Sequence, residues 1–352
     1  MAAMAKQGNG NIVCAWPGIQ WKNTTYGVYM KYFLGIDVGA TKTHALIANE
    51  AGQCLGFGNA GGGNYQNEGY DGLTSALKAS FEQACQMSDV SARQIAGAGF
   101  GIAGYDFPSD REQHLQAIAA LGLSCPVDVV NDAVNGLMAG TSHGYGVNVS
   151  AGSSNNCRGR GQDGREARIV GNGALFGEYG GGMEITMRAL QMVNYAWIKR
   201  GPQTALTRVF LEATGAKDEM DLMEGLSNEK YHLFPYIAVE VFRAANEGDE
   251  AARAVIRWAG EELGWLAVAA IRQLGLEKDE VEVVQSGSVF EGGALITEPM
   301  RALVLQHAPK ARLIRLDAPP VVGAVLLGMQ LAGFDGYAVR TRLIQTAKEI
   351  VK

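Results

Sequence analysis

The chain has 352 residues, of which 47% are hydrophobic and 19% charged, and its formal net charge is −6. This length exceeds what one hydrophobic core usually serves, so we expect two domains. The composition is that of a folded globular protein rather than a disordered one, and the negative charge argues against a nucleic-acid-binding protein, which usually carries a basic face. The 47 glycines are about twice the usual share of roughly 7%, and they gather in a few clusters.

The cysteines and the N-terminus point to an intracellular protein. Five cysteines occur without a CxxC pair, which indicates neither a disulfide framework nor a zinc site. Scattered free thiols fit a reducing cytoplasm, and no apolar stretch approaches membrane-spanning length. Residues 1–31 lack a signal-peptide pattern. They are predicted to form a poorly ordered extension, with an aromatic-rich segment that docks on the body as the alternative.

Regular structure is predicted to begin at Tyr32. Residues 32–37 and 44–48 are apolar runs around a small-residue turn, which predicts strand, turn, strand. Apolar residues then recur every four positions from Leu73 to Cys85, the pattern of one helix face. The remaining elements of this half are a buried strand at 95–103, a helix opened by the capping box Ser109–Glu112, a strand at 126–130, and a helix starting at Asn131-Asp132.

The second half repeats the theme. A strand at 146–150 enters a polar turn at 152–155. The elements expected after it are helices at 182–200, 203–214, 235–247, 250–274 and 294–307, strands at 281–284 and 311–316, and a helix after Pro320. This alternation predicts α/β layers with a mixed sheet in each half. Each half opens with a strand that runs into a glycine-rich turn, and two such turns facing each other would form a clamp.

Two of the turns have the composition of phosphate-binding loops. The first is Asp37-Val38-Gly39-Ala40-Thr41-Lys42-Thr43, where small residues let backbone N–H groups approach a phosphate, and a hydroxyl and a lysine come next. Its spacing is neither a Walker A loop nor a Rossmann fingerprint. The second is Gly152-Ser153-Ser154-Asn155-Asn156, again after an apolar strand. Each alone is equally well explained as an ordinary polar turn, and it is their pairing that indicates phosphate binding.

Three further segments could carry chemistry. Asp132 follows a strand and could accept a proton from an attacking hydroxyl, although aspartate is also an ordinary helix N-cap. The glycine-rich run 171–182 contains a carboxylate, Glu178, suited to binding sugar hydroxyls. The turn 285–289 suits close packing of adenine and ribose, and is otherwise a routine strand-to-helix turn.

Taken in order, these five segments resemble those of the sugar-kinase, Hsp70 and actin superfamily. Within it the chain resembles the N-acetylglucosamine kinase branch, grouped with the BadF/BadG/BcrA/BcrD ATPases, over about residues 32–335. The resemblance implies an α/β fold with two ribonuclease-H-like (actin-like ATPase) lobes around an interdomain cleft. The expected division is an extension over 1–31, an N-terminal lobe over 32–135 and a C-terminal lobe over 136–352.

The resemblance also implies a role for each motif. Asp132 matches the catalytic aspartate, and Asp37 is the expected metal-binding residue, through water. The implied ATP-binding residues are Gly39, Ala40, Thr41, Lys42, Gly152, Ser153, Ser154, Asn155, Phe234, Pro235, Gly287 and Ser288. The implied sugar-binding residues are Asn64, Asp106, Asn131, Gly171, Asn172, Gly173 and Glu178. Asn172 stands where the family has tryptophan, and Glu178 replaces an aspartate, so the exact sugar stays open.

The implied function is an ATP-dependent sugar kinase. With Mg²⁺, it would transfer the γ-phosphate of ATP to a hydroxyl, expected to be O6, of an amino sugar such as N-acetylglucosamine or glucosamine. One alternative is a regulatory ATPase or activator acting on a partner protein, whose relatives hold an iron–sulfur cluster on cysteines; no cysteine pair here has that spacing. Another is an inactive sugar sensor, against which Asp37 and Asp132 argue. A homodimer, as in many relatives, stays open.

Overall fold

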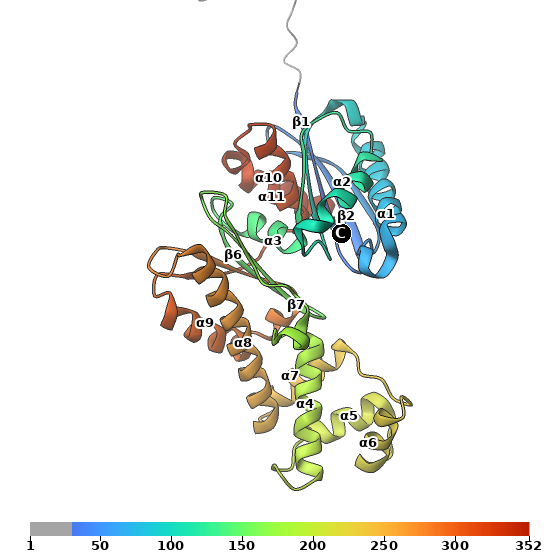
Figure 1. Ribbon diagram of the computed structural model, residues 1–352, viewed down its shortest axis with the longest axis vertical. Coiled ribbons are helices and arrows are strands. Elements are labelled where there is room, and N and C mark those ends of the chain that lie inside the picture. Colours follow the sequence, from blue (N-terminus) through green and yellow to red (C-terminus); the bar gives the residue numbers. More distant parts are fainter. Residues whose placement is uncertain (1–29, 352) are drawn as a thin grey trace, which may run out of the picture. The chain divides into compact units, whose positions relative to one another are not determined.

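The computed structural model describes residues 30–351, which contain two five-stranded sheets with helices around them (Figure 1). The predicted N-terminal extension therefore lies almost wholly outside the described residues. Within residues 30–351, no helix combines the length and the apolar character needed to cross a bilayer.

The first sheet has the strand order β3-β2-β1-β4-β5. Strand β1 pairs antiparallel with β2 and parallel with β4, which pairs parallel with β5. Its strands are β1 (Tyr32–Val38), β2 (Lys42–Asn49), β3 (Cys54–Gly61), β4 (Ile95–Ile102) and β5 (Val127–Asn131), and the helices between and after them are α1 (Tyr65–Ser88), α2 (Arg111–Ala119) and α3 (Asp132–Gly140). The carboxyl ends of the parallel strands β1, β4 and β5 consequently meet at one edge.

The second sheet repeats this arrangement strand for strand, in the order β10-β9-β6-β7-β8. Strand β6 pairs antiparallel with β7 and parallel with β9, as β1 does with β2 and β4. Its strands are β6 (Gly146–Ala151), β7 (Asn155–Arg160), β8 (Glu166–Arg168), β9 (Glu282–Ser286) and β10 (Arg312–Arg315). The predicted structural repeat of the two halves is confirmed.

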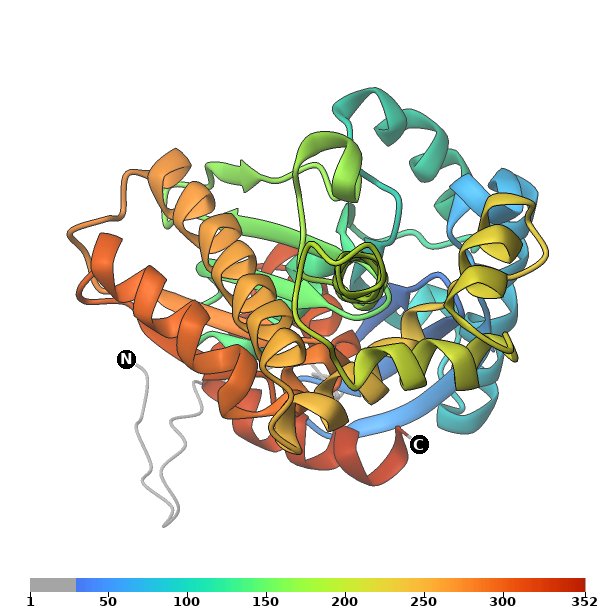
Figure 2. The ribbon, with the colours of Figure 1, turned by 90° about the horizontal axis from the view of Figure 1, so that it is seen from below.

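Most of the helices belong to the second half. Between β8 and β9 the chain forms α4 (Gly182–Trp197), α5 (Leu206–Thr214), α6 (Glu219–Ser227), α7 (Ala238–Asn246) and α8 (Glu250–Leu274), and α9 (Ala294–His307) precedes β10. Figure 2 shows α8 and α9 side by side, and their buried residues share one core with β6 and β9.

The C-terminal helices return to the first sheet. Helix α10 (Val321–Leu331) packs on β1 and β4, and α11 (Arg340–Ile350) contacts β3. Helix α10 comes so close that a Cβ atom at Gly35 or Gly99 would overlap its backbone. Both C-terminal helices thus pack on the first sheet, although the predicted division assigns them to the C-terminal lobe over 136–352. That division stays a prediction.

Some elements differ from expectation. Strand β3 was not predicted because its three glycines obscure the strand pattern; a Cβ at Gly58 would overlap the carbonyl of Ser80 on α1. Helix α6 was not predicted either. The predicted helices at 182–200 and 203–214 are shorter, and the one at 235–247 begins with a 3₁₀ turn over Pro235–Ile237 before α7.

Candidate active site

Two aspartates lie at the carboxyl edge of the first sheet. Asp37 is the penultimate residue of β1, and Asp132 is the first residue of α3, directly after β5. The side chain of Asn131 caps α3 by accepting a hydrogen bond from the Ala133 N–H at 3.0 Å. Two predicted residues, far apart in the sequence, are thus brought to the same sheet edge by parallel pairing through β4.

Both carboxyl groups are harder to ionise than usual. Burial, and after it the negative charge of Asp37, raises the pKa of Asp132 to about 7. Burial raises the pKa of Asp37 to about 6, against a 2.7 Å hydrogen bond from the Asn135 amide and the charge of Lys42. A carboxylate with a pKa near neutral suits a general base at physiological pH.

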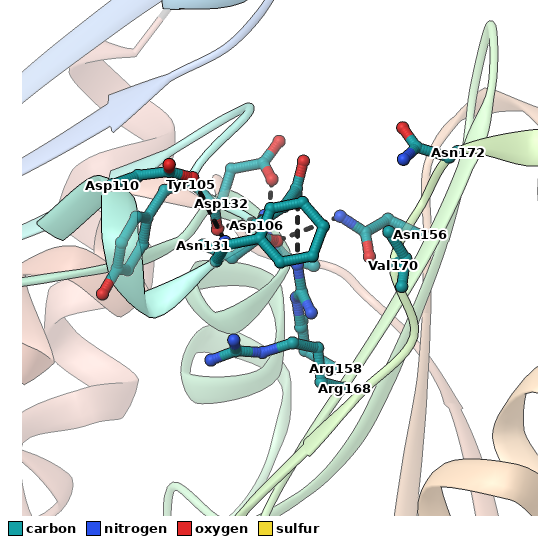
Figure 3. A network of polar contacts seen from close by, with 12 residues as sticks. Tyr105, Asp106, Asp110, Asn131, Asp132, Asn156, Arg158, Arg168, Val170 and Asn172 are labelled. Carbon is teal, nitrogen blue, oxygen red and sulfur yellow. Dashed lines mark hydrogen bonds and ion pairs between the residues drawn. The ribbon is translucent and has the colours of Figure 1, made fainter.

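A polar network joins the two sheets beside Asp132 (Figure 3). Asp106 accepts hydrogen bonds from the Asn131 amide at 3.2 Å and from Arg158 Nη2 on β7 at 2.8 Å. The Asn156 amide on β7 donates to Asn131 Oδ1 at 3.1 Å. Gln66 reaches Asp106 at 3.4 Å. The predicted residues Asp106 and Asn131 therefore lie in direct contact.

Arg158 and Asn156 were not predicted as site residues. Asn156 was part of the second polar turn but received no role, and Arg158 lies two positions after it. Residues two apart on a strand share a face. The signal that could have found Arg158 is therefore its position on the same face as Asn156, in a strand that is largely buried.

The loop that carries Asn64 is attached to the first phosphate-like turn. The Gly63 N–H donates to the Gly39 carbonyl at 3.2 Å, and a Cβ at Gly62 would overlap the carbonyl of Ala40. Asn64 itself caps α1, accepting from the Gln66 N–H at 2.9 Å. In the turn, Ala40, Thr41 and Lys42 are exposed and available to a ligand.

The loop at residues 171–178 is organised by Glu178. This carboxylate is buried, and its two oxygens accept hydrogen bonds from the N–H groups of Val170 at 3.0 Å and Asn172 at 2.8 Å. Asn172 is exposed on the same side as Asp132 and Asn156 in Figure 3. These two hydrogen bonds show that Glu178 holds the loop in shape. Direct contact between Glu178 and a sugar stays a prediction.

The second turn borders a cavity of about 780 Å³, a size that suits a nucleotide. Of the predicted ATP-binding residues, Gly152, Ser153, Pro235 and Ser288 line it. The rest of its wall includes Tyr236 from the 3₁₀ turn before α7, and Val239, Phe242, Arg243 and Asn246 from α7. The α7 residues had no sequence signal beyond a helical pattern.

Other residues of the predicted nucleotide set lie around this cavity without lining it. Phe234 is 45% exposed and stacks on Tyr236, with ring centroids 5.5 Å apart. Gly287 has a φ of 96°, and a Cβ there would overlap the carbonyl of Ala151. The buried Asn155 amide donates to the Glu178 carbonyl and to Glu184, both at 3.3 Å, so this side chain is engaged inside the protein.

The residues present fit Mg²⁺ delivered with a nucleotide. Among residues 30–351, no three His, Cys, Asp or Glu side chains group as metal ligands. A dedicated protein cage is not needed, since Mg²⁺ in phosphoryl-transfer sites is commonly bound by one or two carboxylates plus the substrate phosphates. Burial raises the pKa of Asp37 to about 6, and, after burial, the negative charge of Asp37 in turn raises the pKa of Asp132. A cation bound at Asp37 would neutralise this charge.

Known proteins resemble this chain over most of its length. An N-acetyl-D-glucosamine kinase from Dictyostelium discoideum is 27% identical over 310 residues, 84% of this chain and 97% of the relative. An N-acetylmuramic acid/N-acetylglucosamine kinase from Clostridium acetobutylicum is 25% identical over 303 residues, 85% and 98% of the two chains.

Solved structures confirm the predicted fold class. A Chromobacterium violaceum structure, provisionally assigned as an N-acetylglucosamine kinase, superposes with a TM-score of 0.62 at 22% identity, covering 85% of this chain and 99% of the other. The ROK hexokinase of Thermus thermophilus superposes with a TM-score of 0.53 at 16% identity, covering 85% of this chain and 98% of the other. The family model of the BadF/BadG/BcrA/BcrD ATPases matches residues 34–328. The chain belongs to the BadF/BadG/BcrA/BcrD ATPase family.

Proposed function

We propose that this protein phosphorylates a 2-acetamido sugar, with N-acetylglucosamine as the leading acceptor and O6 as the phosphorylated oxygen. The observation that carries the proposal is the position of Asp132, a half-buried carboxyl at the start of α3, next to Asp37 and to the network around Asp106 and Asn131. Both curated relatives are carbohydrate kinases that match nearly their whole length. The predicted class, an ATP-dependent carbohydrate kinase, is thereby confirmed, and the acceptor and the residue roles are the proposal.

In the proposed reaction, ATP supplies the phosphoryl group and Mg²⁺ neutralises phosphate charge. Asp132 accepts the proton of the acceptor hydroxyl. The oxygen forms a bond to the γ-phosphorus while the bond to the β–γ bridging oxygen breaks, and ADP leaves. The exposed turns 39–42 and 152–154 are the proposed phosphate contacts from the two sheets.

The proposed sugar contacts surround Asp132 on two sides. Asn64, Asp106 and Asn131 come from the first sheet and its loops, and Asn172 stands on the loop that Glu178 organises. Amide and carboxylate groups of this kind can donate to and accept from vicinal hydroxyls. We include Asn156 in this set, because its amide donates to Asn131 at 3.1 Å.

The test is ADP production with glucosamine, N-acetylglucosamine, N-acetylmuramic acid, glucose and mannose, beside a control without sugar. N-acetylglucosamine should stimulate ADP release strongly, and glucosamine less. Mass spectrometry with NMR of the product should place the phosphate on O6. Equal turnover with and without every sugar would refute the proposal, and a product phosphorylated at another oxygen would refute the O6 assignment alone.

A further inference from the structure

A small cavity beside Asn131 has three arginines in its wall. Its volume is about 160 Å³, and its polar wall is formed by Arg111, Arg158, Arg168, Asp128, Glu166 and Asn131. At roughly 30 Å³ per water in the liquid, this is space for only about five waters. The cavity is therefore too small for a nucleotide and has room for a small anion or a short acidic arm.

Arg158 is buried in this wall with unused hydrogen-bond donors. Its side chain is 4% exposed, and Nη2 contacts Asp106 at 2.8 Å. Within residues 30–351, neither Nε nor Nη1 has a hydrogen-bond partner. Buried side-chain donors are nearly always satisfied in folded proteins, so these two nitrogens indicate that a partner outside the chain belongs here.

The position of Arg168 is further evidence that a partner from outside the chain binds here. It lies directly opposite Arg158 in the antiparallel pair of β7 and β8. Like charges at directly opposite positions destabilise a sheet, and an anion bound between them removes that penalty. Arg168 contacts Glu166 at 3.5 Å, a long ion pair whose side chains are both partly exposed.

The acidic side chains nearby engage these two arginines only in part. Asp128 is held by Arg111 at 2.6 Å, Glu166 contacts only Nη2 of Arg168, at 3.5 Å, and Asp106 occupies only Nη2 of Arg158. Figure 3 shows Arg158 reaching toward Asp106, with Arg168 next to it. Guanidinium groups bind carboxylates through directed N–H contacts.

We propose that this arginine cavity binds a carboxylate carried by the acceptor sugar, a step that rests on the proposed function. The cavity shares Asn131 with the proposed sugar contacts, and Asp106, another of them, holds Arg158. A sugar ring placed beside Asp132 can thus extend an acidic substituent past Asn131. The acceptor class would then include acid-bearing 2-acetamido sugars besides neutral ones.

The experiment compares kcat/KM for N-acetylmuramic acid, which carries a carboxylate, with that for N-acetylglucosamine. In Arg168→Met the ratio of acidic to neutral sugar should fall roughly 10-fold to 100-fold, the worth of a hydrogen bond to a charged group. Arg168→Lys should retain part of the preference. Arg165→Met is the matched control, because Arg165 lies between β7 and β8, is 61% exposed and does not line the cavity; its ratio should match the wild type.

The outcomes separate the two proposals. Phosphorylation of N-acetylglucosamine without turnover or binding of N-acetylmuramic acid would overturn the carboxylate site and leave the kinase proposal standing. If neither sugar is phosphorylated, the proposed function fails, and calorimetric binding of N-acetylmuramic acid then decides: binding that is lost in Arg168→Met supports the site, and any other result overturns it. Stabilisation by inorganic phosphate alone that needs Arg168, with no preference for the acidic sugar, would show a free-anion site and overturn the proposal.

Discussion

The two sheets share one strand order and differ in the residues at their strand ends. At the ends of β1 and β5 the first sheet presents Asp37 and Asp132, both with raised pKa values. After β6 and β10, the second sheet carries the turn 152–154 and Asp317, which is 90% exposed. The same scaffold thus holds buried carboxylates on one side, and on the other a glycine and hydroxyl turn beside a large cavity and an exposed carboxylate. This difference suggests that the first sheet carries the proton chemistry and the second the nucleotide.

The largest expected effect is on kcat, and it should differ between two aspartates that follow equivalent strands of the two sheets. Asp132→Asn should lower kcat by roughly 10²-fold to 10⁴-fold, because the general base is lost. The control is Asp317→Asn, after β10, where the carboxylate is 90% exposed and pairs with Lys348 at 2.7 Å; kcat should stay within about twofold. Steady-state ADP release measures both. Comparable losses in the two variants would show that the sheets are not divided in this way.

The next effect concerns the buried ion pair that connects the sheets. Arg158→Met leaves Asp106 buried without its charged partner, which should cost about 3–5 kcal/mol of unfolding free energy. The double variant Asp106→Leu with Arg158→Met should recover much of that loss. Arg111→Met, which breaks the partly exposed pair with Asp128, should cost only about 0–1 kcal/mol. Denaturant unfolding measures all three, and additive losses in the double variant would argue against coupling of the pair.

Two glycines pack next to the two phosphate-like turns, Gly62 against Ala40 and Gly287 against Ala151. Gly287→Ala should destabilise by about 1–3 kcal/mol, because Gly287 has a φ of 96° and no room for a Cβ beside Ala151. Gly62→Ala, crowded by Ala40 but without a positive φ, should cost less. Gly61→Ala is the control, since nothing lies within 4 Å of its Cβ position. Thermal unfolding gives the order, and a Gly61 variant as unstable as the other two would refute the crowding explanation.

The last expected effect is a change of stability with pH, to which the two aspartates of the first sheet contribute. The folded protein holds the protons of Asp132 and Asp37 up to about pH 7 and pH 6, whereas the unfolded chain releases them near pH 3.8. Between these values the folded state binds more protons, so ligand-free stability should fall as the pH rises from about 4 to 7. Asp132→Asn should flatten this slope, and Asp317→Asn should not. Melting temperatures against pH measure it, and an unchanged slope in Asp132→Asn would contradict the assignment.

Much of this protein was readable from local sequence. Apolar runs ending in polar, glycine-rich turns predicted most of the strands, the repeat of the two halves, and both aspartates, because strand ends and helix caps are set by neighbouring residues. The sequence did not predict β3, because its glycines allow close contact with α1 and lack the side chains that mark a strand. The family was predicted from the order of the five motifs, which resembles that of known sugar kinases.

Tertiary structure alone decided the rest. Only packing brings α10 back to the first sheet, places α7 in the wall of the nucleotide-sized cavity, and joins Asp106 to Arg158 across 52 positions of sequence. It also sets the two arginines of β7 and β8 opposite each other, since strand register depends on partners that lie outside either segment. The sequence by itself determined which side chains end the strands, and long-range pairing determined which of them meet.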